Sequence, residues 1–239
     1  MIKSLLLFCL LGISSLFSLS LKDKFMMGEC GSYLVSEQNE LVTLLHLHSK
    51  HEDLLIFEEV TLPLHAAKEI TWKKWLESGA KGHTAWILYE VDLQKRRVLR
   101  TFSVTEQAWI RADEIESFLI PFLFMELTPL SDGERIKKSP SPKAGELETR
   151  FWAPPQVLEG IKQEDPLYDV FCSRWPNDAS ELAGQTLIFY FDQNRKEYPF
   201  PYWIQVREGV IKFKIKALDS GRGLFSPILG FPSKGLKAS

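Results

Sequence analysis

The 239-residue sequence contains only three cysteines, Cys9, Cys30 and Cys172. Small secreted domains that depend on disulfides carry four or more cysteines at regular spacings, so that class of protein is excluded. Cys9 lies in the apolar N-terminal run described below. Cys30 and Cys172 are able to pair in an oxidising compartment, and two free thiols are the alternative.

The chain also has little excess charge of either sign. Its 29 Lys and Arg residues face 31 Asp and Glu residues, which gives a formal net charge of −2. This balance gives no general attraction to nucleic acid or to an anionic membrane surface, so nucleic acid is not expected as a partner. The hydrophobic content of 45% is high enough to build packed cores, which excludes a wholly disordered chain.

Long apolar runs are missing except at the N-terminus. There, a lysine precedes almost unbroken apolar sequence over 4–17, and the small residues Ser18 and Ser20 follow. This layout predicts a secretory signal peptide over 1–20, and an uncleaved N-terminal membrane anchor is the alternative. The best later candidate, 118–125, is far below the roughly 20 residues that a spanning helix needs. The sequence therefore predicts an exported protein, periplasmic or extracellular, without a transmembrane segment after the signal.

A proline-rich stretch over 128–155 separates two globular segments. Proline fixes φ and has no N–H group, which predicts an extended connector there. We therefore predict an α+β domain over 30–127, a β-rich domain over 156–227 and a flexible tail over 228–239. The prolines of the predicted connector are Pro129, Pro140, Pro142, Pro154 and Pro155.

The first segment combines strand-like and helix-like patterns. Residues 71–77 and 113–125 keep apolar side chains at helical spacing, although Pro121 interrupts the second run. This order predicts an antiparallel sheet with two helices on one of its faces. The strands of this sheet are predicted at 41–48, 54–62, 85–93 and 98–104.

The second segment is β-rich throughout. Strands are predicted at 186–191, 202–207 and 210–218, and the last of these alternates apolar residues with lysines. Short strands separated by frequent turns favour a small sandwich- or barrel-like domain.

No segment matches a catalytic or cofactor motif. Neither a Gly-x-Ser-x-Gly elbow nor a His-Glu-x-x-His pair occurs. His46 and His48 share one face of a predicted strand, but no cysteine or carboxylate pattern completes a metal site. We therefore predict no catalytic residue, no metal and no cofactor. A hydrolase in which His83 works with Glu90 or Asp92 is the alternative.

Aromatic rings beside prolines indicate a function more clearly than any other feature. Trp175, Tyr198, Tyr202 and Trp203 each lie one or two residues from a proline. Rings on rigid loops of a β scaffold can stack on sugars or clamp a peptide, so these four are predicted to contact a ligand or partner. Rings that pack under the sheet and complete a small core are the alternative.

These observations together favour an exported, non-catalytic protein that binds a protein or an envelope component. An exported hydrolase of envelope or extracellular substrates is the first alternative. A carbohydrate-binding module that holds a glycan on Trp175, Tyr202 and Trp203 is the second.

Overall fold

The computed structural model describes residues 19–38, 40–136, 151–207 and 212–232, and β-strands make up a large part of them. β4 (Leu54–Pro63) shows the alternating burial of a strand with two different faces. β12 (Thr186–Asp192) is buried at every position after the first, because both of its faces are covered. The other strands are β1 (Leu19–Ser20), β2 (Tyr33–Gln38), β3 (Leu41–His51), β5 (Ala85–Asp92), β6 (Arg97–Ser103), β7 (Ala108–Ile110), β8 (Glu126–Pro129), β9 (Val157–Leu158), β10 (Ile161–Lys162), β11 (Tyr168–Arg174), β13 (Trp203–Val206) and β14 (Lys214–Gly221).

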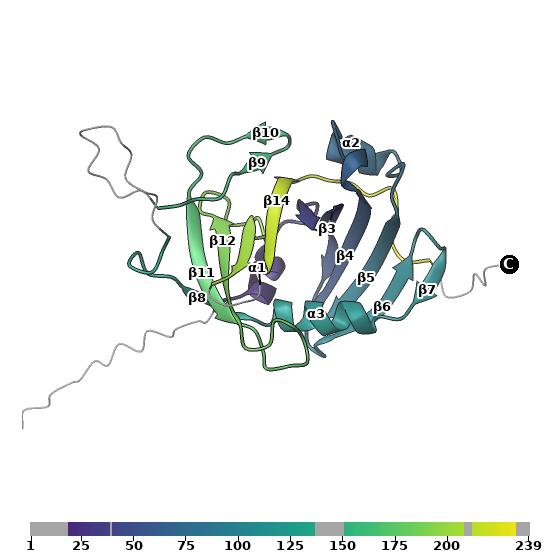
Figure 1. Ribbon diagram of the computed structural model, residues 1–239. Helices are drawn as coiled ribbons and strands as arrows, with labels where there is room; N and C mark the ends of the chain where they lie inside the picture. Colours follow the sequence, from purple (N-terminus) through teal and green to yellow (C-terminus); the bar gives the residue numbers. More distant parts are fainter. Residues whose placement is uncertain (1–18, 39, 137–150, 208–211, 233–239) are drawn as a thin grey trace, which may run out of the picture.

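Twelve of these strands form one antiparallel, strongly curved sheet (Figure 1). Their order across the sheet is β1-β8-β11-β12-β13-β14-β2-β3-β4-β5-β6-β7. β9 and β10 form a separate two-stranded sheet. Most neighbours in the order are also neighbours in sequence, but β1 pairs with β8, β8 with β11, and β14 with β2.

Three α-helices occur in the described chain: α1 (Leu21–Met27), α2 (Trp72–Glu77) and α3 (Asp113–Leu123). α1 begins at a capping box, in which the Ser20 side chain and the Asp23 side chain bond each other's backbone N–H groups. Pro121 lies inside α3, which continues to Leu123. A short 3₁₀ helix spans Leu64–Ala66.

The helices lie on different faces of the sheet. Phe25 of α1 packs edge-on against Phe57 of β4, with 5.2 Å between the ring centroids, and Leu123 of α3 lies in the same core. Leu76 of α2 instead packs with Val60 of β4 in a second core. Because side chains alternate along a strand, Phe57 and Val60 point to opposite faces. The prediction of two helices on one face is therefore wrong.

The predicted fold class is also wrong about the number of separate sheets. An α+β domain followed by a small β-rich domain was expected, but strands from both segments belong to one sheet. β8 pairs with β11 across the proline-rich stretch, and β14 pairs with β2 near the N-terminus. The hydrophobic core is also shared, since Phe25 contacts both Phe57 and Phe200. The proline-rich stretch therefore connects two strands of one sheet and does not separate two domains.

The junction between β14 and β2 depends on a close approach. Gly221, the last residue of β14, pairs with Tyr33, and a β-bulge lies between Ala217 and Asp219. A Cβ atom at Gly221 would lie 2.5 Å from the Tyr33 ring. Glycine is therefore the residue that allows the two segments to join here.

Several predictions fall on residues outside the described ranges. These are residues 1–18 of the predicted signal peptide, Pro140 and Pro142 of the predicted connector, and 233–239 of the predicted tail. Cys30 and Cys172 are free thiols, each half-buried. Within the described residues, no helix has the length and apolar character needed to cross a membrane.

Candidate functional site

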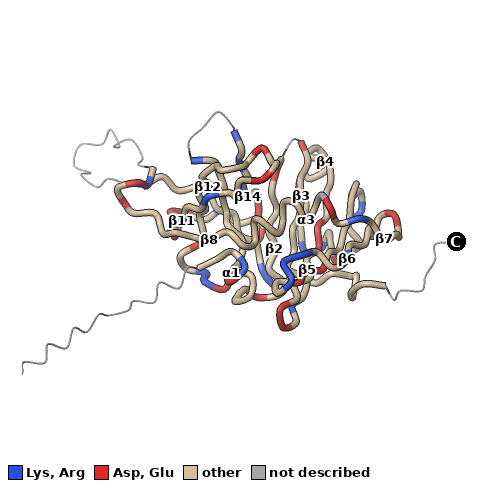
Figure 2. Tube along the Cα trace, turned by 90° about the horizontal axis from the view of Figure 1, so that it is seen from below, with Lys and Arg blue, Asp and Glu red and all other residues tan. Residues whose placement is uncertain are grey.

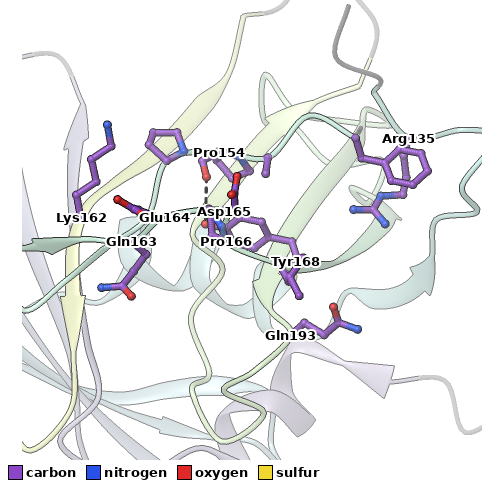
Figure 3. Close-up of a pocket in the computed structure, with 13 residues that line it drawn as sticks. Arg135, Pro154, Lys162, Gln163, Glu164, Asp165, Pro166, Tyr168 and Gln193 are labelled. Carbon is purple, nitrogen blue, oxygen red and sulfur yellow. Dashed lines mark hydrogen bonds between the residues drawn. The ribbon is translucent and has the colours of Figure 1, made fainter. Parts of the chain in front are cut away.

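A cavity of about 1220 Å³ lies beside the two-stranded sheet (Figure 3). Pro154, Pro155 and Pro166 line it, and we call it the proline-lined cavity. Tyr168, the first residue of β11, also lines it and donates a hydrogen bond of 3.3 Å from its hydroxyl to the Pro154 carbonyl. This bond ties the segment before β9 to β11. Proline rings and a hydrogen-bonded tyrosine make these walls stiff.

The charges around the proline-lined cavity balance. Arg135 and Lys162 are basic and lie on opposite sides of the view in Figure 3, while Glu164 and Asp165 are acidic. The whole chain shows the same mixture, because acidic and basic residues are interspersed along the trace (Figure 2). A cavity without net charge does not favour a polyanion such as nucleic acid.

One exposed apolar side chain lines this cavity, and two more lie next to lining residues in the sequence. Leu167 lines it and is 56% exposed, and Ile161 of β10 is 67% exposed. Ile136, next to Arg135, is 43% exposed and accepts a backbone hydrogen bond from Trp152. An exposed leucine in the lining of a cavity is available to contact another molecule.

Three of the four rings predicted to contact a ligand are buried. Trp175, Tyr198 and Tyr202 are each no more than 2% exposed, and Trp203 is half-buried. Trp175 lies apart from the other three, stacked on Phe118 of α3 at 5.3 Å. A buried ring offers no face on which a sugar can stack. The sequence placed Pro154 and Pro155 in the predicted connector, but it did not indicate the cavity that they line together with Pro166.

Tyr198 and Tyr202 lie together at the junction of the sheet, with 5.2 Å between their ring centroids. The Tyr198 hydroxyl donates to the Tyr33 carbonyl at 2.7 Å. The Tyr202 hydroxyl accepts hydrogen bonds from Arg195 at 3.0 Å and from Ser220 at 3.1 Å. Burial raises the pKa of both phenols, so they remain neutral hydrogen-bonding groups. Their contacts hold β2, β13 and β14 together.

Comparison with known proteins shows the family to which this chain belongs. A family model described as CT021 protein matches residues 43–164, about half of the sequence. The chain belongs to the CT021 protein family. The matched residues include β4 to β10 and part of the rim of the proline-lined cavity.

A solved structure supports the family's fold. The hypothetical protein CT021 from Chlamydia trachomatis, determined at 2.0 Å resolution, is 18% identical to this chain with a TM-score of 0.64. The match covers 90% of this chain and 98% of that chain. At this identity the likeness shows the fold alone. The search of curated proteins found no match.

A buried polar cluster lies on the face of the sheet that α2 covers in this CT021 family member. Glu58 is fully buried and accepts hydrogen bonds from Trp86 at 2.8 Å and from Ser226 at 2.5 Å. His46 Nδ1 lies 2.8 Å from the same carboxylate. His48 contacts the Ile228 carbonyl through Nε2 at 2.8 Å. These contacts fasten the C-terminal segment across the sheet, and sequence reasoning missed them because the partners lie far apart along the chain.

The residues of the hydrolase alternative are not brought together by any contact among the described residues. His83 Nδ1 lies 2.9 Å from the Ala80 carbonyl. Glu90 receives two hydrogen bonds from Arg100, and Asp92 accepts the backbone N–H of Lys95. The described residues also contain no group of three or more metal-ligating side chains.

The buried carboxyl of Asp219 lies in β14, at the junction between β14 and β2. Its Oδ1 accepts backbone hydrogen bonds from Gly160 at 3.1 Å and Ser220 at 2.8 Å, yet burial raises its pKa above the usual 3.8. A raised pKa means that ionisation destabilises the fold as the pH rises through the folded-state value. We expect Asp219→Asn, which keeps the Oδ1 acceptor, to be more stable than the parent at pH 7.

The difference in free energy of unfolding between Asp219→Asn and the parent should shrink as the pH falls. It should vanish below 3.8, where the parent carboxyl is protonated in both the folded and the unfolded state. Urea unfolding of both proteins at several pH values measures it. An Asp219→Asn variant that is less stable than the parent at pH 7 would contradict the prediction.

Proposed function

We propose that the chain is an exported, non-catalytic protein that binds an extended segment of a partner polypeptide in the proline-lined cavity. The observation that carries this proposal is the pairing of a stiff, charge-balanced cavity with an exposed leucine, Leu167, in its lining. Leu167 would bury its side chain against the partner, and the burial of a leucine is worth about 1.5–3 kcal/mol. Stiff walls lose little conformational entropy on binding.

The edge of β10 adds a second source of affinity. β10 pairs with β9 on one side, and no other strand of the described chain pairs with it. An extended peptide can add itself to such an edge through main-chain hydrogen bonds while its side chains enter a neighbouring cavity. Lys162, at the end of β10, lines the proline-lined cavity, so edge and cavity are continuous.

The export part of the proposal depends on the pattern of residues 1–20. Cleavage after Ser20 would remove the pairing of Leu19 with Leu127 and the cap of α1. Loss of a serine cap typically costs about 1 kcal/mol. α1 would still be held by Leu21 and Phe25, which are both buried. Mass spectrometry of the protein recovered from its native host gives the first residue of the mature chain and so tests this part.

Leu167→Asp tests the binding site. Peptides are first selected from a phage-displayed random library on the parent protein, and their dissociation constants are then measured by fluorescence polarisation. A carboxylate in place of a buried leucine is expected to weaken binding at least about tenfold, which corresponds to about 1.4 kcal/mol.

Leu229→Asp is the matched control, because Leu229 is 96% exposed and does not line the cavity. It should bind the same peptides with unchanged affinity. Circular dichroism establishes that both variants are folded. Failure to enrich any peptide, or equal affinity of Leu167→Asp and parent, would reject the proposal.

A further inference from the structure

A second cavity, of about 870 Å³, lies where the end of α3 meets β8, β11 and β12. Its apolar lining includes Ile120, Phe124 and Met125. Arg96, Arg174 and Arg207 also line it, and we call it the arginine-rimmed cavity. It shares no lining residue with the proline-lined cavity. Its volume is in the usual range for small-molecule sites, which is about 300–1,000 Å³.

The charge of this cavity differs from that of the rest of the chain. Its three arginines are opposed by the lining carboxylate Glu126 and by Glu134, which pairs with Arg207, so a positive excess remains. The proline-lined cavity is balanced, and the whole chain has a net charge of −2. A local excess of positive charge beside low-dielectric walls attracts anions. The cavity is therefore suited to a ligand that is anionic at one end.

The arginines are held in place by contacts of different kinds. The Arg96 guanidinium lies over the Phe124 ring, 4.5 Å from its centroid, and Lys22 lies 5.5 Å from the same centroid. Arg207 forms an ion pair with Glu134 at 3.3 Å. Arg174 donates from Nε to the Gly184 carbonyl at 3.2 Å. A guanidinium has five N–H donors, so Arg174 can bond an anion while it keeps this contact.

We propose that the arginine-rimmed cavity binds a single-chain amphipathic anion. Arg174 and Arg96 contact its carboxylate or phosphate head, because a planar guanidinium matches either group with two parallel hydrogen bonds. Its hydrocarbon tail lies against Ile120, Phe124 and Met125, the apolar side chains at the end of α3 and beyond it. A fatty acid and a lysophospholipid both have this chemistry.

Isothermal titration calorimetry of the full chain tests the proposal with dodecanoate, dodecyl phosphate, uncharged dodecanol and inorganic phosphate, all used as monomers. Both amphipathic anions should bind at least about tenfold more tightly than dodecanol and than inorganic phosphate, since a charge-assisted hydrogen bond contributes about 1.5–3 kcal/mol. Tighter binding of dodecanoate indicates a fatty acid as the source, and tighter binding of dodecyl phosphate indicates a lysophospholipid.

Three variants locate the binding. Arg174→Gln and Arg96→Gln change exposed side chains and should each weaken binding of the anions about tenfold. Arg111→Gln is the control, because Arg111 is exposed and lines neither cavity. Equal binding of dodecanol and dodecanoate, or unchanged affinity in both Arg174→Gln and Arg96→Gln, would overturn the proposal. Leu167→Asp should bind the anions as the parent does, so this result is independent of the peptide experiment.

Discussion

Replacing Glu58 by alanine is expected to lower the free energy of unfolding by about 3–5 kcal/mol. The carboxylate is fully buried, and it is the acceptor for Trp86 and Ser226 and the partner of His46. Alanine leaves the buried Trp86 and His46 groups without this partner, and each unsatisfied buried group costs about 1–3 kcal/mol. The C-terminal segment also loses its bond through Ser226. Equilibrium urea unfolding measures the loss.

Two further variants define the cause. Glu106→Ala removes an exposed glutamate and should change stability by no more than about 0.5 kcal/mol. Glu58→Gln keeps a buried acceptor of similar size and should fall between the parent and Glu58→Ala. If Glu58→Ala were as stable as Glu106→Ala, the buried cluster would have no structural role.

Trp175→Ala should produce a loss of similar size, about 3–5 kcal/mol, because it empties a large volume in a packed core. The Trp175 ring is 1% exposed, stacks on Phe118 and donates from Nε1 to Asp178 at 2.9 Å. Thermal or urea unfolding measures the effect. Trp203→Ala, at a half-buried ring, should cost less.

Binding measurements on the same variant separate a packing role from a ligand contact. If Trp175 serves packing, Trp175→Ala protein that remains folded should bind the selected peptides with the affinity of the parent. A variant of unchanged stability that lost peptide binding would instead restore Trp175 as a contact residue.

Local elements of this fold could be predicted from the sequence. The pattern over 85–93 predicted β5 (Ala85–Asp92), and the run over 71–77 predicted α2 (Trp72–Glu77). Such elements follow from apolar spacing and turn residues, which act over a few positions. The pairing of β14 with β2 joins residues about 180 positions apart, and no local pattern encodes it. The division into two domains failed for this reason.

The candidate site was harder to predict. In helices and strands, regular apolar spacing predicts which side chains are buried, but loop residues have no such regular spacing. Tyr198 and Tyr202 lie beside prolines as expected, but their rings point inward and hold the junction together. Glu58 is an acidic residue in a strand and is ordinarily solvated, yet partners 28 and 168 residues away make it a buried acceptor. The proline-lined cavity forms only once segments on either side of β9 and β10 pack over β11.

Hydrogen exchange of the full chain, with and without a selected peptide, tests the proposed function most directly. If the peptide occupies the proline-lined cavity, amide exchange should slow at residues 151–155 and 161–168 and stay unchanged around the arginine-rimmed cavity. Slower exchange confined to other parts of the sheet, with no change at 161–168, would contradict peptide binding at this site.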